Sequence, residues 1–287
     1  MSAFLIVLLV AAAALHAAWN LLMKQSADRQ LLMWPALAVS AVVSLPLVAF
    51  RPPISGVWTL VLISSALEAA YYALLMAAYG IGDFSVVYPI ARGVAPALLA
   101  VWAVVFLGEH PSAGGIAGIA LVVAGLFFTG SGTGSTPGAP GIRQRVGAAG
   151  AAVAVLLAVL ISVYSAIDGA AVKRADATAY TVVLYALTTL MLTPLVLWRH
   201  GWRPVARAMR AEPARILAVG VLQALAYMTV LVVYSRGSVS YAGAIREVSI
   251  VIAALVGWLY LGEAFGVRRL AGAVVMFGGI LLIAVAG

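Results

Sequence analysis

The sequence predicts an all-α integral membrane protein with ten transmembrane helices, arranged as two inverted five-helix repeats. The prediction depends on the composition, on ten long apolar stretches and on a repeat that relates the two halves. Of the 287 residues, 65% are hydrophobic and 9% are charged, and the mean hydropathy is +1.12. A soluble domain carries about a quarter charged residues and a disordered chain has low hydrophobicity, so both classes are excluded.

The residue types also exclude several kinds of site. The chain has no cysteine, which removes disulfide frameworks, thiolate metal ligands and thiol catalysis. The three histidines, His16, His110 and His200, fall in different segments and predict no zinc cluster. We therefore expect no metal and no cofactor. The net charge of +8 is attributed to basic loops, as in other membrane proteins, and not to a nucleic-acid partner.

Ten apolar stretches are long enough to cross about 30 Å of hydrocarbon. They must be helices, because irregular backbone cannot face lipid and the sequence lacks the alternation of an outer-membrane barrel. No basic segment precedes the first stretch, so a cleaved signal peptide is not expected. The stretches cover residues 3–23, 31–50, 57–79, 84–107, 114–130, 147–171, 178–198, 215–236, 241–261 and 270–286.

Within and between these stretches, proline, glycine and arginine mark particular features. Three prolines inside the stretches, Pro46, Pro96 and Pro194, each remove a helical hydrogen bond and are expected to kink their helices. The kinks are either bends used in transport or purely structural. Residues 131–146 form a Gly/Ser/Pro linker between one five-helix unit, residues 1–130, and a second, residues 147–287. The glycines of the fifth and tenth stretches allow close helix approach. The segment from Arg199 to Arg215 holds five arginines and is either a short interfacial helix or a solvated loop.

The two halves repeat one another in sequence. Val105-Phe-Leu-Gly-Glu109 recurs as Leu259-Tyr-Leu-Gly-Glu263 at an offset of 154 residues. Further matches in the same order are Arg92 with Arg246, Glu68 with Gln223, Tyr72 with Tyr227, Tyr79 with Tyr234, and Asn20 with Asp168. Five spans in each copy place the second copy upside down in the membrane, about a pseudo-twofold axis in the membrane plane. Such inverted repeats are the basis of alternating access.

Five ionisable residues lie inside the predicted spans: Glu68, Arg92, Asp168, Arg246 and Glu247. An ionised group at mid-bilayer costs at least ~2.5–3.5 kcal/mol, so each is a candidate functional residue. One interpretation is structural neutralisation, for instance of Glu68 by Arg92 and of Asp168 or Glu247 by Arg246. The other is that some of them line a water-filled cavity and contact substrate or protons.

Polar and aromatic residues recur at helical spacing in three of the spans. One stripe runs from Glu68 through Tyr71, Tyr72 and Met76 to Tyr79, another from His16 through Trp19 to Asn20 and Met23, and a third joins Tyr164 to Asp168. A lipid-facing surface would instead carry Leu, Val and Ala. We favour a pore lining over polar packing between helices.

These motifs resemble the EamA-domain family of the drug/metabolite transporter superfamily. The residues that carry the resemblance are Phe106-Leu-Gly-Glu109 with Gly118 and Gly125, Tyr260-Leu-Gly-Glu263 with Gly272 and Gly279, and His16-Ala-Ala-Trp19-Asn20. The resemblance covers nearly the whole chain and implies a secondary carrier, with a cavity built largely from spans 1, 3, 4, 6, 8 and 9. Departures include Ile250 at the position matching Pro96. The His-x-x-Trp-Asn opening is similar to a subgroup associated with phosphonate utilisation.

We therefore expect a secondary-active membrane transporter, and no enzyme, in the cytoplasmic or inner membrane. It would export a small polar metabolite such as an amino acid or related zwitterion, as a monomer or homodimer. Alternatives are a lipid or head-group flippase and an integral-membrane enzyme. For proton or cation coupling we expect Glu68, Asp168 and Glu247. For substrate binding we expect His16, Trp19, Asn20, Tyr71, Tyr72, Met76, Tyr79, Tyr88, Arg92, Tyr164, Gln223, Tyr227 and Arg246.

The membrane orientation is open between two indications. The loops that follow spans 1, 3, 5, 7 and 9 hold most of the lysines and arginines, and by the positive-inside rule this puts both termini outside. The family resemblance implies termini in the cytoplasm.

Overall fold

The computed structural model describes residues 1–26, 28–81, 84–130, 148–261 and 267–287, and within these ranges it contains helices and no strand. The predicted linker falls outside them, as does the second Leu-Gly-Glu motif beyond Leu261. The helices are α1 (Ala3–Lys24), α2 (Arg29–Val48), α3 (Trp58–Ile81), α4 (Phe84–Leu107), α5 (Ala113–Gly130), α6 (Ala148–Val172), α7 (Ala177–His200), α8 (Trp202–Ala211), α9 (Pro213–Arg236), α10 (Val239–Ile245), α11 (Val248–Leu261) and α12 (Val267–Ala286).

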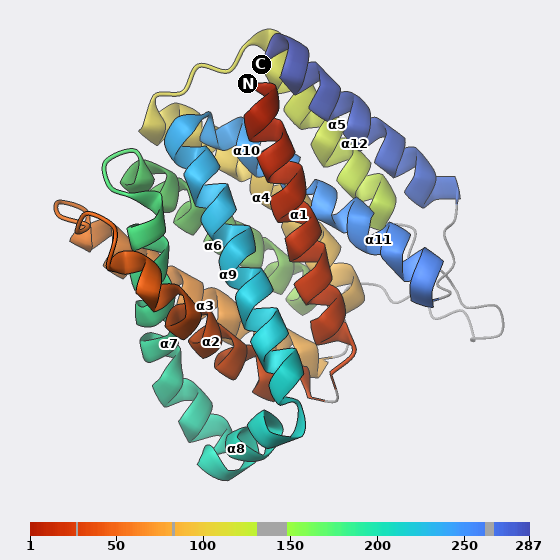
Figure 1. Cartoon of the computed structure of the whole chain (residues 1–287). Coiled ribbons are helices and arrows are strands. Elements are labelled where there is room, and N and C mark those ends of the chain that lie inside the picture. Colours follow the sequence, from red (N-terminus) through yellow and green to blue (C-terminus); the bar gives the residue numbers. More distant parts are fainter. Residues whose placement is uncertain (27, 82–83, 131–147, 262–266) are drawn as a thin grey trace.

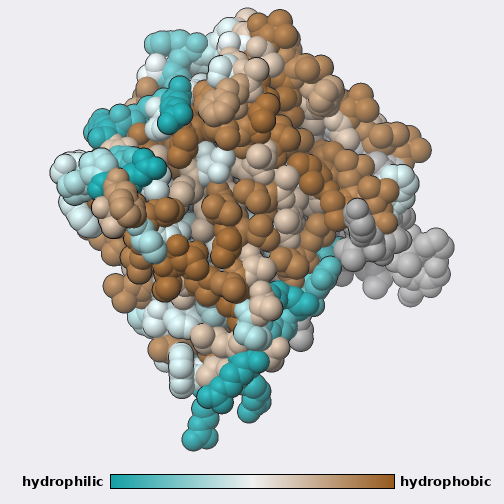
Figure 2. Space-filling view, viewed as in Figure 1, coloured by the Kyte–Doolittle hydropathy of each residue, from teal (hydrophilic) through white to brown (hydrophobic). Residues whose placement is uncertain are grey.

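The all-α prediction is confirmed, and the chain is a multi-pass membrane protein. Seven segments are long and apolar enough to cross a membrane, and three further apolar helices of 10–17 described residues lie at 91–107, 113–128 and 270–286. A count of ten spans stays a prediction. Hydrophobic side chains cover much of the visible surface of the bundle (Figure 2). Phe4, Phe106 and Leu190 are each more than half exposed, as expected for side chains that face lipid.

Short polar side chains begin several helices. Ser2 accepts a hydrogen bond from the Leu5 amide, Asp28 from Leu31 and Asp176 from Ala179, at the starts of α1, α2 and α7. These bonds satisfy amides that have no partner inside the helix. The helices α2 and α7 both continue through their prolines, Pro46 and Pro194.

The ninth predicted span differs from the expectation of one continuous helix. It consists of α10 and α11, interrupted at Arg246 and Glu247. Around the interruption the amides of Glu247, Ser249 and Ile250 bond carbonyls three residues earlier instead of four, which is 3₁₀ geometry. The tightened turn coincides with two adjacent charged side chains, both of them buried and paired with other polar groups.

The packing of the two halves follows a matching pattern. The helix α1 packs on α9 as α6 packs on α3, and α2 packs on α9 as α7 packs on α3. The corresponding helices α2 and α7 contact each other, as do α5 and α12, which lie side by side in Figure 1. This is the contact pattern that a twofold relation between the halves requires, although the inverted repeat itself stays a prediction.

Glycine allows α5 and α12 to approach closely. A Cβ on Gly118 would lie 2.8 Å from the carbonyl oxygen of Gly279, and a Cβ on Gly279 would lie 2.6 Å from that of Gly118. Both separations are too short for real atoms. The two backbones therefore meet where glycine removes the side chain from each helix.

Polar contacts tie the helix ends together at two opposite ends of the bundle (Figure 1). At the end that holds both termini, the Met1 amino group donates to the Gly287 carbonyl at 3.4 Å and Lys173 donates to the Gly237 carbonyl at 2.6 Å. At the α8 end, Ser26 donates to Glu212 at 3.1 Å and Arg215 donates to the Gln25 carbonyl at 3.0 Å. We call these the termini end and the α8 end.

Candidate functional site

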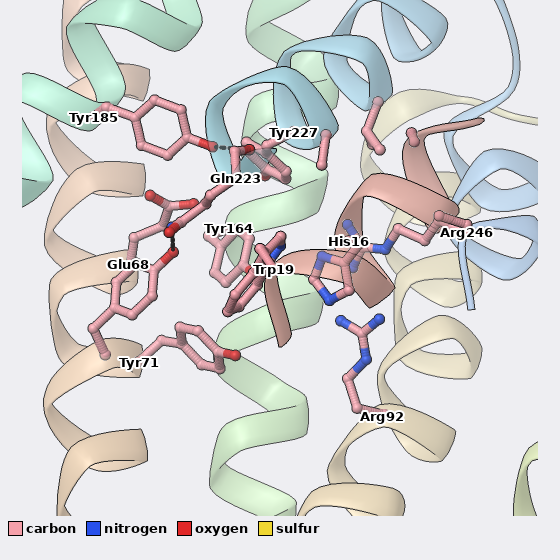
Figure 3. Close-up of a pocket in the computed structure, with 15 residues that line it drawn as sticks. His16, Trp19, Glu68, Tyr71, Arg92, Tyr164, Tyr185, Gln223, Tyr227 and Arg246 are labelled. Carbon is pink, nitrogen blue, oxygen red and sulfur yellow. Dashed lines mark hydrogen bonds between the residues drawn. The ribbon is translucent and has the colours of Figure 1, made fainter. Parts of the chain in front are cut away.

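One polar cavity lies inside the bundle, between α1, α3, α4, α6, α7, α9 and the turn after α10 (Figure 3). Its open volume is about 60 Å³, which is room for about five water molecules. The lining residues are Ala12, Ala13, His16, Trp19, Glu68, Tyr71, Tyr72, Arg92, Tyr164, Tyr185, Gln223, Ala226, Tyr227, Val230 and Arg246. Most of the residues predicted to bind substrate are therefore brought to one place.

Positions that correspond in the two halves converge on this cavity. The pairs are His16 with Tyr164, Glu68 with Gln223, Tyr72 with Tyr227, and Arg92 with Arg246, and all eight residues line it. The corresponding positions differ in charge only on α3 and α9, where the carboxylate of Glu68 corresponds to the neutral amide of Gln223. The cavity thus combines a symmetric framework with an asymmetric charge distribution.

Two arginines form one side of the cavity. Arg92 from α4 lies 2.9 Å from one oxygen of Glu247, and Nε of Arg246 lies 3.3 Å from the other. Arg92 and Arg246 also donate to the hydroxyls of Ser249 and Ser165, at 3.3 and 3.4 Å. Glu247 is fully buried and does not line the cavity. One carboxylate thus serves two guanidinium groups, so three ionised side chains would leave a net positive charge.

Glu68 lies on the opposite side of the cavity from the arginines, as Figure 3 shows. It is buried and accepts a hydrogen bond from Thr188 of α7 at 3.2 Å. Among the described residues Glu68 forms no ion pair. Structural neutralisation of buried charges, one of the two interpretations given above, therefore applies to Glu247 and Arg246. The predicted ion pair between Glu68 and Arg92 is not formed.

Asp168 is fully buried behind the cavity wall and accepts hydrogen bonds from three hydroxyl groups. Ser64 and Tyr180 donate to Oδ1 at 2.5 and 2.7 Å, and Tyr227 donates to Oδ2. Asp168 forms no ion pair with any described residue. Its contact with the cavity is therefore indirect, through the Tyr227 hydroxyl.

Some buried polar atoms of the lining have no hydrogen-bond partner among the described residues. They include Nε2 of His16, Nε1 of Trp19 and Oε1 of Gln223. The rings of His16 and Trp19 pack edge to face at a centroid distance of 4.9 Å. The other polar atom of the Gln223 amide, Nε2, donates to the Tyr72 hydroxyl at 2.5 Å. Buried polar groups are almost always paired, so these atoms indicate where water or a ligand would bind.

Four predicted residues lie elsewhere. Asn20 donates to the backbone carbonyl of His16 at 2.8 Å, within α1. Met76 is packed in an apolar cluster with residues of α2 and α9. The side chains of Tyr79 and Tyr88 are outside the described part of the chain. Among the described residues, no group of three His, Asp or Glu side chains comes close enough together to hold a metal ion.

Tyr185 and Thr188 are functional candidates that the sequence reading missed, because span 7 was not counted among the cavity helices. Tyr185 lines the cavity and donates to the Gln223 carbonyl at 3.0 Å. A polar stripe at helical spacing, Thr178, Thr181, Tyr185, Thr188 and Thr189, marks this face of α7. That stripe was the signal that could have found them.

Comparison with known proteins agrees with the fold and the motifs. A solved structure titled "Crystal structure of protein" superposes with a TM-score of 0.77 at 17% identity, over 98% of this chain and 96% of that chain. At this identity the likeness shows the fold alone. No curated protein matches the sequence. A sequence model described as the EamA-like transporter family matches residues 148–285. Residues 148–285 are therefore similar to the EamA-like transporter family, which confirms the predicted resemblance to the drug/metabolite transporters for this half of the chain.

Proposed function

We propose that this protein is a secondary-active transporter that exports a small zwitterionic metabolite, such as an amino acid or an aminophosphonate. The match of residues 148–285 to a transporter family supports this class of activity. Export is the direction that the resemblance implies. The proposal for the substrate depends on one observation, the separation of Glu68 from Arg92 and Arg246 across a single cavity.

This separation suits a ligand with one anionic and one cationic end. The arginines present more positive charge than Glu247 neutralises, and guanidinium groups bind carboxylates and phosphonates through directed hydrogen bonds. Glu68 has no cationic partner among the described residues and would accept an ammonium group. The rings of Trp19, Tyr71 and Tyr164 lie between the two charged sides (Figure 3), where they would pack against the apolar part of the ligand and attract its cation.

Alternating access would follow from the matching contacts of the two halves. Corresponding helices make corresponding contacts around the cavity, and inverted repeats of this kind place substrate at the interface of the repeats. Polar contacts join helix ends at both the termini end and the α8 end. A transport cycle would open these two sets of contacts in turn.

Coupling to a proton or cation gradient would use the buried carboxylates, Glu68, Asp168 and Glu247. Glu247 already serves as the shared counter-ion of two arginines. Glu68 and Asp168 have hydroxyl partners and no ion pair among the described residues. These two are therefore the better sites for reversible protonation.

The test is a ligand screen on purified protein followed by transport in proteoliposomes. Amino acids, aminophosphonates, cationic drugs and phospholipid head groups would be compared by thermal shift. We expect zwitterions to stabilise the wild type, Arg92→Gln to weaken that binding by at least about tenfold, and Glu68→Gln to favour ligands that lack the ammonium group. Arg51→Gln, on the termini end, is the matched control and should bind as the wild type does.

Other outcomes would contradict the proposal. Zwitterion binding that survives Arg92→Gln unchanged would place the anion-binding role elsewhere. Movement of labelled lipid between leaflets, with no flux of a soluble solute, would indicate a flippase. Turnover of a ligand in detergent, dependent on Glu68 and without vesicles, would indicate an enzyme.

A further inference from the structure

The hydrogen bonds of Asp168 couple a buried carboxyl group to one hydroxyl in the cavity. Its partners come from three other helices: Ser64 from α3, Tyr180 from α7 and Tyr227 from α9. Ser64 and Tyr180 are fully buried and do not line the cavity. Tyr227 is partly exposed and does line it.

The two oxygens of Asp168 are not equivalent. Oδ1 accepts from two hydroxyls, whereas Oδ2 accepts from Tyr227 alone. A carboxylic acid has one proton to donate. A proton on Oδ1 would point toward two hydroxyls that already donate to that oxygen, whereas a proton on Oδ2 would conflict with one such donor. The proton therefore belongs on Oδ2, beside Tyr227.

Protonation at Oδ2 must then change what Tyr227 does. While Asp168 is ionised, the single hydroxyl proton of Tyr227 is donated to it, and the phenol oxygen offers only a lone pair to the cavity. Once Asp168 is protonated it donates to that oxygen, and the hydroxyl proton of Tyr227 must turn to another acceptor. Because Tyr227 faces the cavity, that acceptor is water or ligand.

We propose that Asp168 is a positioning residue whose protonation converts Tyr227 from a hydrogen-bond acceptor into a hydrogen-bond donor in the cavity. This inference relies on the proposed transport function, and it names the coupling device of that same site. Protonated Asp168 thereby favours a ligand that places an oxygen acceptor at Tyr227, such as a carboxylate or phosphonate oxygen. Ionised Asp168 favours a ligand donor or water there.

The surroundings of Asp168 allow either state. Arg246 and Glu68 act on it electrostatically with opposite signs. Of the other elements packed on α6, α4 carries Arg92, α7 carries Tyr180 and Tyr185, and α9 carries Tyr227. The corresponding position in the first half is Asn20, an amide that cannot ionise. The device therefore exists in one half only, so the two sides of the cavity respond differently to protons.

The test is infrared difference spectroscopy of the purified protein in nanodiscs, without ligand, as the pH is lowered from about 9 to about 4. We expect the wild type to gain a protonated-carboxyl band together with a change in a tyrosine C–O(H) band. Asp168→Asn should lose the tyrosine change, because its amide donates permanently to Tyr227, and the part of the carboxyl band that belongs to Asp168, while Glu68 and the other carboxyl groups keep theirs. Tyr227→Phe should keep a carboxyl band and lose the tyrosine change.

Tyr241→Phe is the matched control, since it removes a tyrosine hydroxyl that accepts from the Ser112 amide and does not line the cavity. It should keep both signals. The proposal is overturned if Asp168→Asn leaves the carboxyl band undiminished, or if the tyrosine change survives Tyr227→Phe. No substrate enters this measurement, so it can fail while zwitterion transport holds, and it can succeed if the ligand screen fails.

Discussion

At the scale of single residues, Glu247 is the counter-ion that allows two arginines to be buried in an apolar protein. Each of its oxygens contacts a different guanidinium group, and it is fully shielded from solvent. The sequence placed Arg246 and Glu247 side by side but could not show that Arg92, more than 150 residues earlier, meets the same carboxylate. That contact needs α4 to lie against the α10–α11 turn.

We predict that Glu247→Gln destabilises the protein by about 3–5 kcal/mol, because removing one partner of a buried ion pair leaves uncompensated charge. Thermal unfolding in detergent would measure this. Acetate or phosphate should restore part of the lost stability by pairing with the arginines.

The control is Glu212→Gln, which removes a partly exposed ion pair with Arg215 at the α8 end. Exposed pairs contribute about 0–1 kcal/mol. Equal losses of stability in the two variants would show that Glu247 does not stabilise the buried arginines.

At the scale of elements, α8 settles one of the alternatives that the sequence left open. The arginine-rich segment forms a helix, and Val205 is buried against its neighbours. Arg203, Arg207 and Arg210 recur at i, i+4 and i+7, so they share one exposed face. None of the three forms an ion pair with a described residue. Trp202, beside them, is 58% exposed, and Figure 2 shows hydrophilic side chains gathered at this end of the molecule.

We predict that α8 lies on the membrane surface and binds anionic phospholipid head groups, at about 1 kcal/mol per arginine. Phosphatidylglycerol in nanodiscs should raise the unfolding temperature relative to phosphatidylcholine alone. The triple variant Arg203→Gln, Arg207→Gln, Arg210→Gln should lose most of this response.

The matched control for this prediction replaces Arg51, Arg174 and Arg236 at the termini end with glutamine. It changes the net charge equally and should keep the response to the anionic lipid. A response lost equally in both triple variants would mean that net charge, and not α8, binds the lipid.

At the scale of the whole molecule, the cavity exists because corresponding helices of the two halves meet. Residues of both halves line it, and polar contacts join helix ends at both ends of the bundle. The proposed alternating-access cycle would break one set of these contacts in each half of the cycle.

We predict that short thiol cross-links at either end stop transport and leave ligand binding intact. The chain has no cysteine, so pairs can be introduced alone: Lys173→Cys with Ser238→Cys at the termini end, or Ser26→Cys with Glu212→Cys at the α8 end. Flux in proteoliposomes should fall to background after cross-linking and return after reduction. Flux that continues through both cross-linked forms would rule out alternating access.

The sequence by itself determined the membrane class, the helical fold, most of the helix bounds and most of the cavity residues. These features depend on hydropathy and on the 3.6-residue helical periodicity, which are local properties that can be read directly from the sequence. Only the tertiary structure decided that Tyr185 joins the cavity, that Glu247 contacts both arginines, that Glu68 pairs with no cation among the described residues, and that Tyr227 donates to Asp168. Each of these is a contact between helices far apart in the chain, and the polarity of a side chain does not encode its partner.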